Sequence, residues 1–303
     1  MADRARTVGV LGLGVMGGNL AARLVASGFE VVGHDVSDTC NDAAARDGVR
    51  IVADAAAVAR QAGRIVCLVE TGAQVLDVVR QVAPEMGEGD TFLCMSTVDL
   101  PVIEEAAGIV ARSGADYLDA PVSGGGAAAR SGTLVSILGG AAEAVERCRP
   151  VIEAVSARHF HVGAIGQGFA AKMVNNLAFH TLSVAVIEAM VLGTKAGIDP
   201  DRMYGLLSNA TGDSQALRMR VPRMLARDFD GVPLAVAFRE LLMETGLAAR
   251  EGVPVPLARM AEEVHRMGMA RGHGPEDGAA LVKVYEDLAG VTVEAGTPRE
   301  EAR

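Results

Sequence analysis

Short runs of apolar, β-branched residues alternate with alanine-rich segments over the first half of the chain. The runs predicted as strands are residues 7–11, 30–34, 64–69, 91–95 and 116–118. The segments between them, such as residues 53–61, carry apolar residues at helical spacing. Strand–helix alternation is typical of parallel strands with helices on both faces, so the pattern predicts a doubly wound Rossmann α/β sheet.

Beyond residue 166 the pattern is helical only. Asp199-Pro200 starts one helix, with Asp as N-cap and Pro at the first helical position. Further helices are predicted at residues 214–226, 235–250, 256–267 and 276–289. We therefore predict an α/β domain over residues 1–164 and an all-α domain over residues 165–290. A joining helix covers residues 165–193, and residues 291–303 form a mobile tail.

Composition narrows the function classes. The 303 residues include 50% hydrophobic and 22% charged residues, which is ordinary for a globular protein. A net charge of −10, 3% aromatic residues and no Trp argue against nucleic acid as a partner. The four cysteines show no C-x-x-C spacing, and Cys67 and Cys94 lie in predicted strands. These features predict reduced cysteines in a cytoplasmic protein.

Neither a targeting signal nor a membrane anchor is predicted. The apolar N-terminal run leads directly into a glycine fingerprint and a folded pattern. The long run over residues 165–193 carries Lys172, Asn175, Asn176, His180 and Glu188. We expect it to be too polar to span a bilayer and to form a mostly buried helix, so no membrane partner is predicted.

The first candidate site follows the first predicted strand and opens a helix. It consists of Gly12, Leu13, Gly14, Val15, Met16 and Gly17. The first glycine permits a tight turn, the second admits a pyrophosphate and the third allows close helix packing. A simple glycine-rich turn is the alternative, but the strand, the helix and a later acidic residue agree with dinucleotide binding.

That acidic residue is Asp35, at the end of the next predicted strand. Its carboxylate can accept hydrogen bonds from ribose hydroxyls and would repel a 2′-phosphate. The next residue is Val36 and not an arginine. We therefore predict NAD as the cofactor, preferred over NADP.

A second glycine-rich segment follows the strand at residues 116–118. Its sequence is Asp119-Ala120-Pro121-Val122-Ser123-Gly124-Gly125-Gly126. Ligands of open α/β sheets bind beyond the carboxyl ends of the strands, and consecutive glycines can present N–H groups to an anion. A substrate carboxylate is the anion expected here, and a flexible glycine turn is the alternative.

Lys172 is one of only three lysines, against 25 arginines. Arginine keeps its proton, whereas a desolvated lysine can lose its proton near neutrality, so a lysine retained here suggests proton transfer. Asn176 and His180 follow at helical spacing on the same face. A surface lysine is the alternative for Lys172, and a local core hydrogen bond is the expected role of His180. His159 and His161 have no Cys or carboxylate at ligand spacing, so no metal is predicted.

Three segments in this order resemble the β-hydroxyacid dehydrogenase family, which includes 3-hydroxyisobutyrate dehydrogenase and tartronate semialdehyde reductase. They are the fingerprint at residues 12–17, the segment at residues 119–125 and the segment from Gly166-Gln167-Gly168 to Asn175-Asn176. The resemblance implies that Lys172 is the catalytic lysine and Asn176 its partner. It implies that Ser123, Gly124 and Gly125 contact the substrate carboxylate, and that Thr97 lies near the nicotinamide. We also assign Leu68 to the cofactor site.

Two positions depart from the family pattern. Cys94 stands where the family often has Asp, and Arg239-Glu240 stands where it often has a Lys-Asp pair that reaches the cofactor site. Arg239 keeps the positive charge and is assigned to the cofactor site, although its geometry differs. We expect these two departures to affect which substrate is bound more than which reaction is catalysed.

These residues together predict an oxidoreductase that transfers a hydride between NAD and a short hydroxy acid, similar to 3-hydroxyisobutyrate, or its semialdehyde. An imine reductase of the same architecture and a non-catalytic nucleotide-binding module are the alternatives. The intact Lys172 and Asn176 count against both. The helical domain is small and apolar, which predicts a homodimer or homotetramer.

Overall fold

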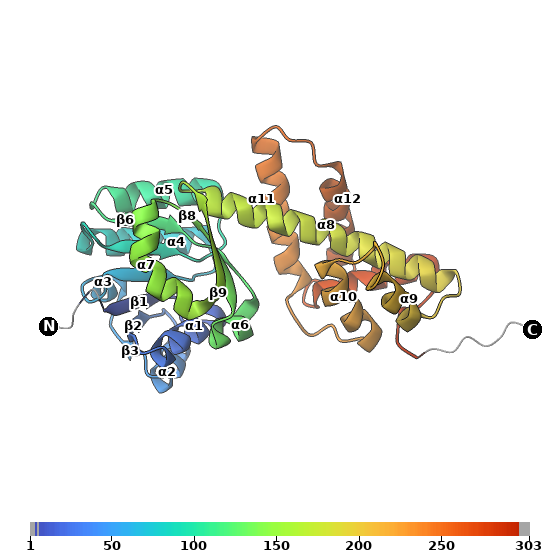
Figure 1. Ribbon diagram of the computed structural model, residues 1–303, viewed down its shortest axis with the longest axis horizontal. Coiled ribbons are helices and arrows are strands. Elements are labelled where there is room, and N and C mark those ends of the chain that lie inside the picture. The colour runs from blue at the N-terminus through green and yellow to red at the C-terminus, as the bar shows by residue number, and fades with distance from the viewer. Residues whose placement is uncertain (1–3, 5, 297–303) are drawn as a thin grey trace, which may run out of the picture. The chain divides into compact units, whose positions relative to one another are not determined.

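The computed structural model describes residues 4 and 6–296, and it divides the chain into two compact units. The first is Met1–Lys172 and the second is Met173–Arg303 (Figure 1). The division falls inside the long helix α8, after the residue 164 at which the sequence pattern places the boundary.

A mixed sheet forms the centre of the first unit. Its strands are β1 (Thr7–Leu11), β2 (Glu30–His34), β3 (Arg50–Ile51), β4 (Arg64–Cys67), β5 (Thr91–Cys94), β6 (Asp116–Asp119), β7 (Val122–Ser123), β8 (Leu134–Gly139) and β9 (Ser156–Gly163). The order is β3-β2-β1-β4-β5-β6-β8-β7, with β9 also paired to β8. The pairs from β3 to β6 are parallel, as predicted, whereas β8 runs antiparallel to β6 and β7. The Rossmann prediction is confirmed, but the sheet is not wholly parallel.

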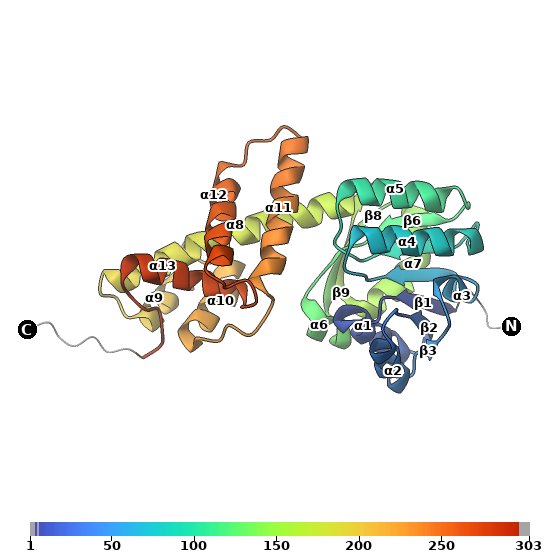
Figure 2. The same cartoon turned by 180° about the vertical axis from the view of Figure 1, so that it is seen from behind.

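Helices cover both faces of this sheet. They are α1 (Val15–Ala26), α2 (Asp38–Arg46), α3 (Ala55–Ala59), α4 (Gly72–Val82), the short 3₁₀ helix η1 (Ala83–Glu85), α5 (Leu100–Ala111), α6 (Gly125–Ser131) and α7 (Ala142–Val155). The helices α1, α6 and α7 pack together on one face, and α3, α4 and α5 cover the other (Figure 2). The two helical layers exclude water from both faces of the strands.

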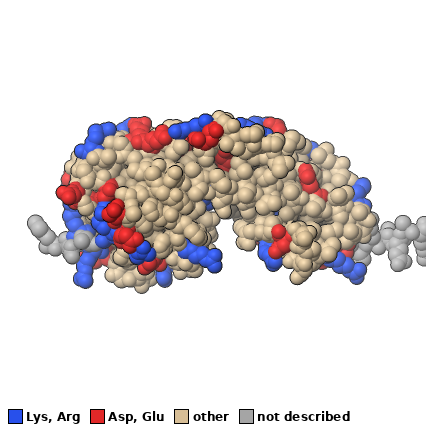
Figure 3. Space-filling view, turned by 45° about the horizontal axis from the view of Figure 1, so that its top comes forward, with Lys and Arg blue, Asp and Glu red and all other residues tan. Residues whose placement is uncertain are grey.

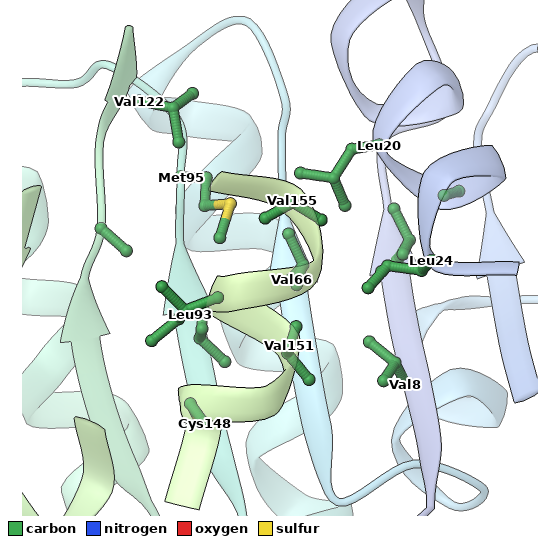
Figure 4. Close-up of a cluster of buried hydrophobic side chains, with 14 of the residues drawn as sticks. Val8, Leu20, Leu24, Val66, Leu93, Met95, Val122, Cys148, Val151 and Val155 are labelled. Carbon is green, nitrogen blue, oxygen red and sulfur yellow. The ribbon is translucent and has the colours of Figure 1, made fainter. Parts of the chain in front are cut away.

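One apolar cluster of this unit lies between the sheet and the α1 and α7 layer. Val8, Val66 and Leu93 project from three neighbouring strands toward Leu20 of α1 and Val151 of α7 (Figure 4). All five are fully buried. Strands buried on both faces are rich in branched apolar residues, which is why the sequence signal for β1, β4 and β5 is strong.

The second unit is helical, as predicted. It contains most of α8 (Gln167–Lys195), and then α9 (Pro200–Leu207), α10 (Gln215–Ala226), α11 (Leu234–Arg250), α12 (Pro256–Ala270), the 3₁₀ helix η2 (Gly278–Leu281) and α13 (Val282–Ala289). The side chain of Asp199 accepts from the N–H of Arg202 and caps α9, and Ser214 caps α10 in the same way. The predicted start at Asp199-Pro200 is therefore correct.

Two predictions about this unit need correction. The predicted helix over residues 276–289 divides into η2 and α13. The predicted tail begins too early, because Val293 is fully buried and its N–H donates to Glu286 Oε1 at 2.7 Å. Residues 297–303 of that tail lie outside the described residues.

Helix α8 is long and apolar enough, by length and composition alone, to cross a membrane. Its polar residues therefore do not exclude a span, contrary to our expectation. Half of its most apolar 18-residue window is buried within the protein. The core helix of a soluble protein passes the same test, so the feature is weak support for a membrane span.

Candidate functional site

The loop between β1 and α1 requires glycine at two positions. Gly12 has φ +86°, and a Cβ there would lie 2.2 Å from the carbonyl oxygen of Leu68. A Cβ on Gly17 would lie 1.8 Å from the carbonyl oxygen of Gly12. The backbone of β1, the loop after β4 and the first turn of α1 therefore approach each other as the fingerprint predicts.

The N-terminus of α1 is open to a ligand. Gly14 is the N-cap residue; no side chain caps the helix and no acidic residue lies in its first turn. A Cβ on Gly14 would meet nothing within 4 Å, and Val15 is 79% exposed, while Leu13 is buried and Met16 partly buried. Uncapped N–H groups and the helix dipole favour an anion, so the loop fits a pyrophosphate.

Asp35 is held by two backbone donors. The N–H of Leu13 donates to Oδ2 at 2.6 Å, and the N–H of Ser37 donates to Oδ1 at 2.8 Å. These bonds orient the carboxylate beside the fingerprint loop and leave it lone pairs for a ribose hydroxyl. Val36 is 92% exposed, so its position could accept a larger side chain. These residues fit the adenosine half of a nicotinamide dinucleotide.

Leu68 and Thr97 lie in the loops that follow the carboxyl ends of two neighbouring strands, β4 and β5. Cys67 of β4 lies in register with Leu11 of β1 on one side and Cys94 of β5 on the other. The Ser96 hydroxyl accepts from the N–H of Val69 at 2.8 Å and joins the loops that follow β4 and β5. The structure therefore brings Gly12, Leu68 and Thr97 to one edge of the sheet, where ligands of such sheets bind.

The second glycine segment lies beside this edge. Gly124 has φ +136° and caps α6, and Gly125 has φ +75°. A Cβ on Gly126 would lie 3.0 Å from Cγ1 of Val15, so the start of α6 abuts the start of α1. Ser123 is partly buried, whereas Gly124 and Gly125 are exposed. Two loops with available N–H groups thus lie side by side.

Asp119 has a role that the sequence reasoning missed. It ends β6 and is 1% exposed, and its carboxylate accepts from the N–H groups of Gly166 at 2.8 Å and Phe169 at 2.7 Å. Burial raises the pKa of this carboxyl, and the backbone donors oppose that shift. Asp119 therefore caps the N-terminus of α8, the helix that carries Lys172. An acidic residue at the end of an apolar strand was the available signal.

Lys172 is 6% exposed, so the interpretation as a surface lysine is wrong. It lies in the second turn of α8, whose start is packed closely against the sheet. A Cβ on Gly168 would lie 2.7 Å from the carbonyl oxygen of Asp119, and a Cβ on Gly139 would lie 2.7 Å from the N–H nitrogen of Gly168. This close approach fixes the helix start, and with it the backbone position of Lys172.

In the helical unit, Asn176 is 7% exposed and its Nδ2 donates to Oε2 of Glu240 at 3.0 Å. Glu240 therefore accepts a hydrogen bond from Asn176, the residue predicted as the partner of Lys172. Arg239, the neighbouring candidate, is exposed. His180 makes a core contact, as predicted, because its Nδ1 lies 2.9 Å from Oε1 of Glu244, but this partner lies on another helix, α11.

The described residues hold no metal-binding cluster and no reactive cysteine pair. Among residues 4 and 6–296, no group of three or more His, Cys, Asp and Glu could hold a metal ion. All four cysteines are free thiols, and burial raises the pKa of both Cys94 and Cys148 to about 11. On the face shown in Figure 3, acidic and basic side chains are interspersed among uncharged residues. Such a mixed surface differs from the basic patch typical of a nucleic-acid interface.

Known proteins share both units. Residues 7–163 match the NAD binding domain of 6-phosphogluconate dehydrogenase, and residues 166–285 match the NAD-binding domain of NADP-dependent 3-hydroxyisobutyrate dehydrogenase. The chain therefore belongs to the β-hydroxyacid dehydrogenase family, as the sequence resemblance implied. It is an NAD(P)-dependent dehydrogenase acting on hydroxy acids, by homology.

Three relatives illustrate the range of this family. The chain is 32% identical to 2-(hydroxymethyl)glutarate dehydrogenase of Eubacterium barkeri, over 97% of this chain and 99% of the relative. It is 32% identical to L-threonate dehydrogenase of Cupriavidus necator, over 94% and 97%. A structure of Mycobacterium tuberculosis 3-hydroxyisobutyrate dehydrogenase with L-serine aligns with a TM-score of 0.88 and 28% identity, over 94% of this chain and 99% of that chain.

Proposed function

We propose that this dehydrogenase oxidises a short hydroxy acid, similar to 3-hydroxyisobutyrate, with NAD, and that Lys172 is the general acid/base. The observation that carries the proposal is the burial of Lys172 in a helix whose start is capped by Asp119. Desolvation favours the neutral amine, which is the form that can accept a proton.

We assign each residue of the site a separate role in the reaction. The bound nicotinamide dinucleotide supplies the hydride acceptor for the oxidation. Lys172 accepts the proton of the substrate hydroxyl and returns it in the reverse direction. Asn176, one helical turn from Lys172 and held by Glu240, presents a fixed amide to lysine or substrate. We assign the pyrophosphate to residues 12–17 and the nicotinamide end to Leu68, Thr97 and Arg239.

The substrate carboxylate is assigned to Ser123, Gly124 and Gly125. Support comes from the exposure of Gly124 and Gly125, since consecutive glycines can present N–H groups to an anion, and from the neighbouring start of α1. The names of the three relatives give the same chemistry, because 2-(hydroxymethyl)glutarate, L-threonate and 3-hydroxyisobutyrate all carry a carboxylate and a hydroxyl.

The preference for NAD over NADP is also proposed. The Asp35 carboxylate is fixed beside the fingerprint loop by Leu13 and Ser37, where it would repel a 2′-phosphate. Val36, which is exposed, offers that phosphate no positive charge.

A substrate panel tests the function. Initial rates are measured with 3-hydroxyisobutyrate, L-threonate, 2-(hydroxymethyl)glutarate and L-serine, each with NAD and with NADP. We expect at least one acid to react with NAD far better than uncharged alcohols of similar size do. Reduction of cyclic imines with no turnover of any hydroxy acid would favour the imine reductase alternative. Cofactor binding without any turnover would favour the binding module.

Assembly and location are further parts of the proposal. Leu192, Leu257 and Met260 of the helical unit are each at least 66% exposed, which supports a homodimer or homotetramer formed through that unit. Light scattering after size-exclusion chromatography gives the mass that tests this.

Four free thiols, three of them buried, support a cytoplasmic protein. Fractionation of cells that express the protein tests the location.

A further inference from the structure

Helices α8 and α11 of the helical unit are joined by two side-chain contacts, one turn apart on both helices. In the first, Asn176 Nδ2 donates to Glu240 Oε2 at 3.0 Å. In the second, His180 Nδ1 lies 2.9 Å from Glu244 Oε1. Both α8 residues and both α11 residues are four positions apart, so the contacts form consecutive rungs between two facing helix sides. We call these four residues the α8–α11 ladder.

The second rung is the more deeply buried. His180 is 3% exposed and Glu244 is 1% exposed, whereas Glu240 is only partly buried. With the carboxyl group ionised, the proton lies on Nδ1 and Glu244 accepts it in a charge-assisted hydrogen bond. Separation of such a buried pair leaves polar groups without water, which is costly. The second rung therefore opposes any slip or rotation of α11 against α8.

The surroundings favour this single arrangement. The His265 ring of α12 lies edge-on to His180, with the ring centroids 5.8 Å apart. Burial lowers the pKa of His265 to about 4, so it is neutral near pH 7 and does not repel a charged neighbour. Nδ1 of His265 lies 2.8 Å from the carbonyl oxygen of Ala261, which fixes that ring.

The first rung sets the direction of the Asn176 amide. Its Nδ2 is directed to Glu240, and its Oδ1 accepts from Nδ2 of Asn175 at 3.1 Å. A slip of α11 would move the Glu240 carboxylate and release the amide. We propose that His180 and Glu244 are positioning residues that hold Glu240 in place and thereby orient Asn176. The kinetic part of this inference rests on the proposed role of Asn176 in the reaction.

The kinetic test compares two substitutions of His180. His180→Gln retains a side-chain N–H that can reach Glu244, whereas His180→Leu has similar bulk and no donor. For the best acid of the panel, we expect the leucine variant to lower kcat roughly 10-fold and the glutamine variant to stay within about threefold of the unaltered enzyme. The dissociation constant of NAD should change much less than kcat in both variants, because the fingerprint loop and Asp35 belong to the other unit and only Arg239 of the proposed cofactor contacts lies on α11.

The same leucine substitution in an Asn176→Ala background separates positioning from a general structural role. If His180 acts through Asn176, the His180→Leu substitution should lower kcat by less than about twofold in the Asn176→Ala background. A full additional loss in that background would overturn the inference. Normal kcat in Asn176→Ala itself would instead contradict the role of Asn176 in the proposed function, and the two failures are therefore distinguishable.

A spectroscopic test needs no substrate. The chain has five asparagines, so labelling Asn with ¹⁵N gives five side-chain amide pairs in an NMR spectrum, and the Asn176→Ala spectrum identifies one of them. We expect the Asn176 amide hydrogens to exchange with solvent several-fold faster in His180→Leu and to be protected again in His180→Gln. Unchanged exchange in a folded leucine variant would overturn the inference.

Discussion

The carboxylate of Asp119, at the end of β6, accepts a 2.7 Å hydrogen bond from the backbone N–H of Phe169, in the first turn of α8. A buried carboxylate thus connects the strand before the Ser123 loop with the helix that carries Lys172. Both lie within the first unit. The proposed substrate anchor and the proposed acid/base therefore belong to one compact unit and are linked through the hydrogen bonds of Asp119.

The first prediction concerns this cap. Asp119→Ala removes the acceptor of two N–H groups at the start of α8 and should cost about 2 kcal/mol of unfolding free energy. It should also lower kcat, because the helix start can shift and carry Lys172 with it. Asp119→Asn keeps a side-chain oxygen and should lose less of both. Denaturant unfolding and initial rates measure the two effects, and an alanine variant with unaltered kcat would contradict the positioning role.

Sequence reasoning was strongest where strands are buried on both faces. The bounds of β1 and β2 were predicted to the residue, because each apolar run is followed by a turn. The two-residue strands β3 and β7 were missed, since two residues carry no periodicity. The six-residue strand β8 was not predicted either. Its antiparallel direction depends on which partner the strand meets and not on its own residues.

At the candidate site, too, the sequence predicts residues that a local pattern marks but not the contacts that tertiary packing decides. The fingerprint glycines, Asp35 and Lys172 are marked by residue type and local spacing, and the sequence alone singled them out. The contacts of Asp119 with Phe169 and of His180 with Glu244 join residues 50 and 64 positions apart. Such pairs are decided by tertiary packing, which no local pattern specifies. Glu240 was noticed only as a departure from the family, and its bond to Asn176 required the structure.

The second prediction concerns the proposed carboxylate site. Gly124 has φ +136°, and a Cβ there would lie 2.7 Å from the Cβ of Ala128. Gly124→Ala should therefore distort the loop and raise the KM of the acid roughly 10-fold or more, with little change in NAD binding. Gly28→Ala is the matched control, because Gly28 also has positive φ but lies in open space after α1. Equal effects of both substitutions on KM would indicate general strain.

The third prediction concerns the choice of cofactor. The double substitution Asp35→Ser with Val36→Arg removes the carboxylate and adds a partner for a 2′-phosphate. It should move the ratio of kcat/KM for NADP over NAD upward by at least roughly 10-fold. Asp38→Ser, which removes a neighbouring exposed carboxylate, should leave the ratio unchanged. If the unaltered enzyme already uses NADP as efficiently as NAD, the proposed preference is wrong.

The fourth prediction concerns stability in acid. Burial lowers the pKa of His265 from its ordinary 6.5 to about 4. The unfolded chain therefore takes up a proton at higher pH than the folded protein, and stability contributed by neutral His265 is present above 6.5 and is lost as the pH falls toward 4. From about pH 7 to about pH 5 this loss should be about 2 kcal/mol.

His265→Leu removes that titration. Denaturant unfolding monitored on the helical unit at both pH values measures its contribution. We expect a smaller loss of stability on acidification in the leucine variant than in the unaltered protein. Identical pH dependence in the two proteins would show that His265 is not the group responsible.

The fifth prediction concerns Lys172. Lys172→Ala should lower kcat by roughly 10²–10⁴-fold, the usual range for a positioned acid/base, with NAD affinity close to that of the unaltered enzyme. Lys172→Arg separates charge from proton exchange, because arginine keeps the positive charge and does not release the proton. If proton transfer is the role, the arginine variant should fail nearly as severely as the alanine variant.

The larger guanidinium group could also lower kcat by obstructing the buried position, since Lys172 is only 6% exposed. The KM of the acid is therefore measured beside kcat, because obstruction should raise KM and loss of proton transfer should not. The pH profile gives an independent control, since the rate of oxidation should rise with an apparent pKa that disappears in Lys172→Ala. An arginine variant with near-normal kcat and an unchanged profile would show that the proton is accepted elsewhere. His180 would not be the simplest replacement, because its Nδ1 is already directed to Glu244.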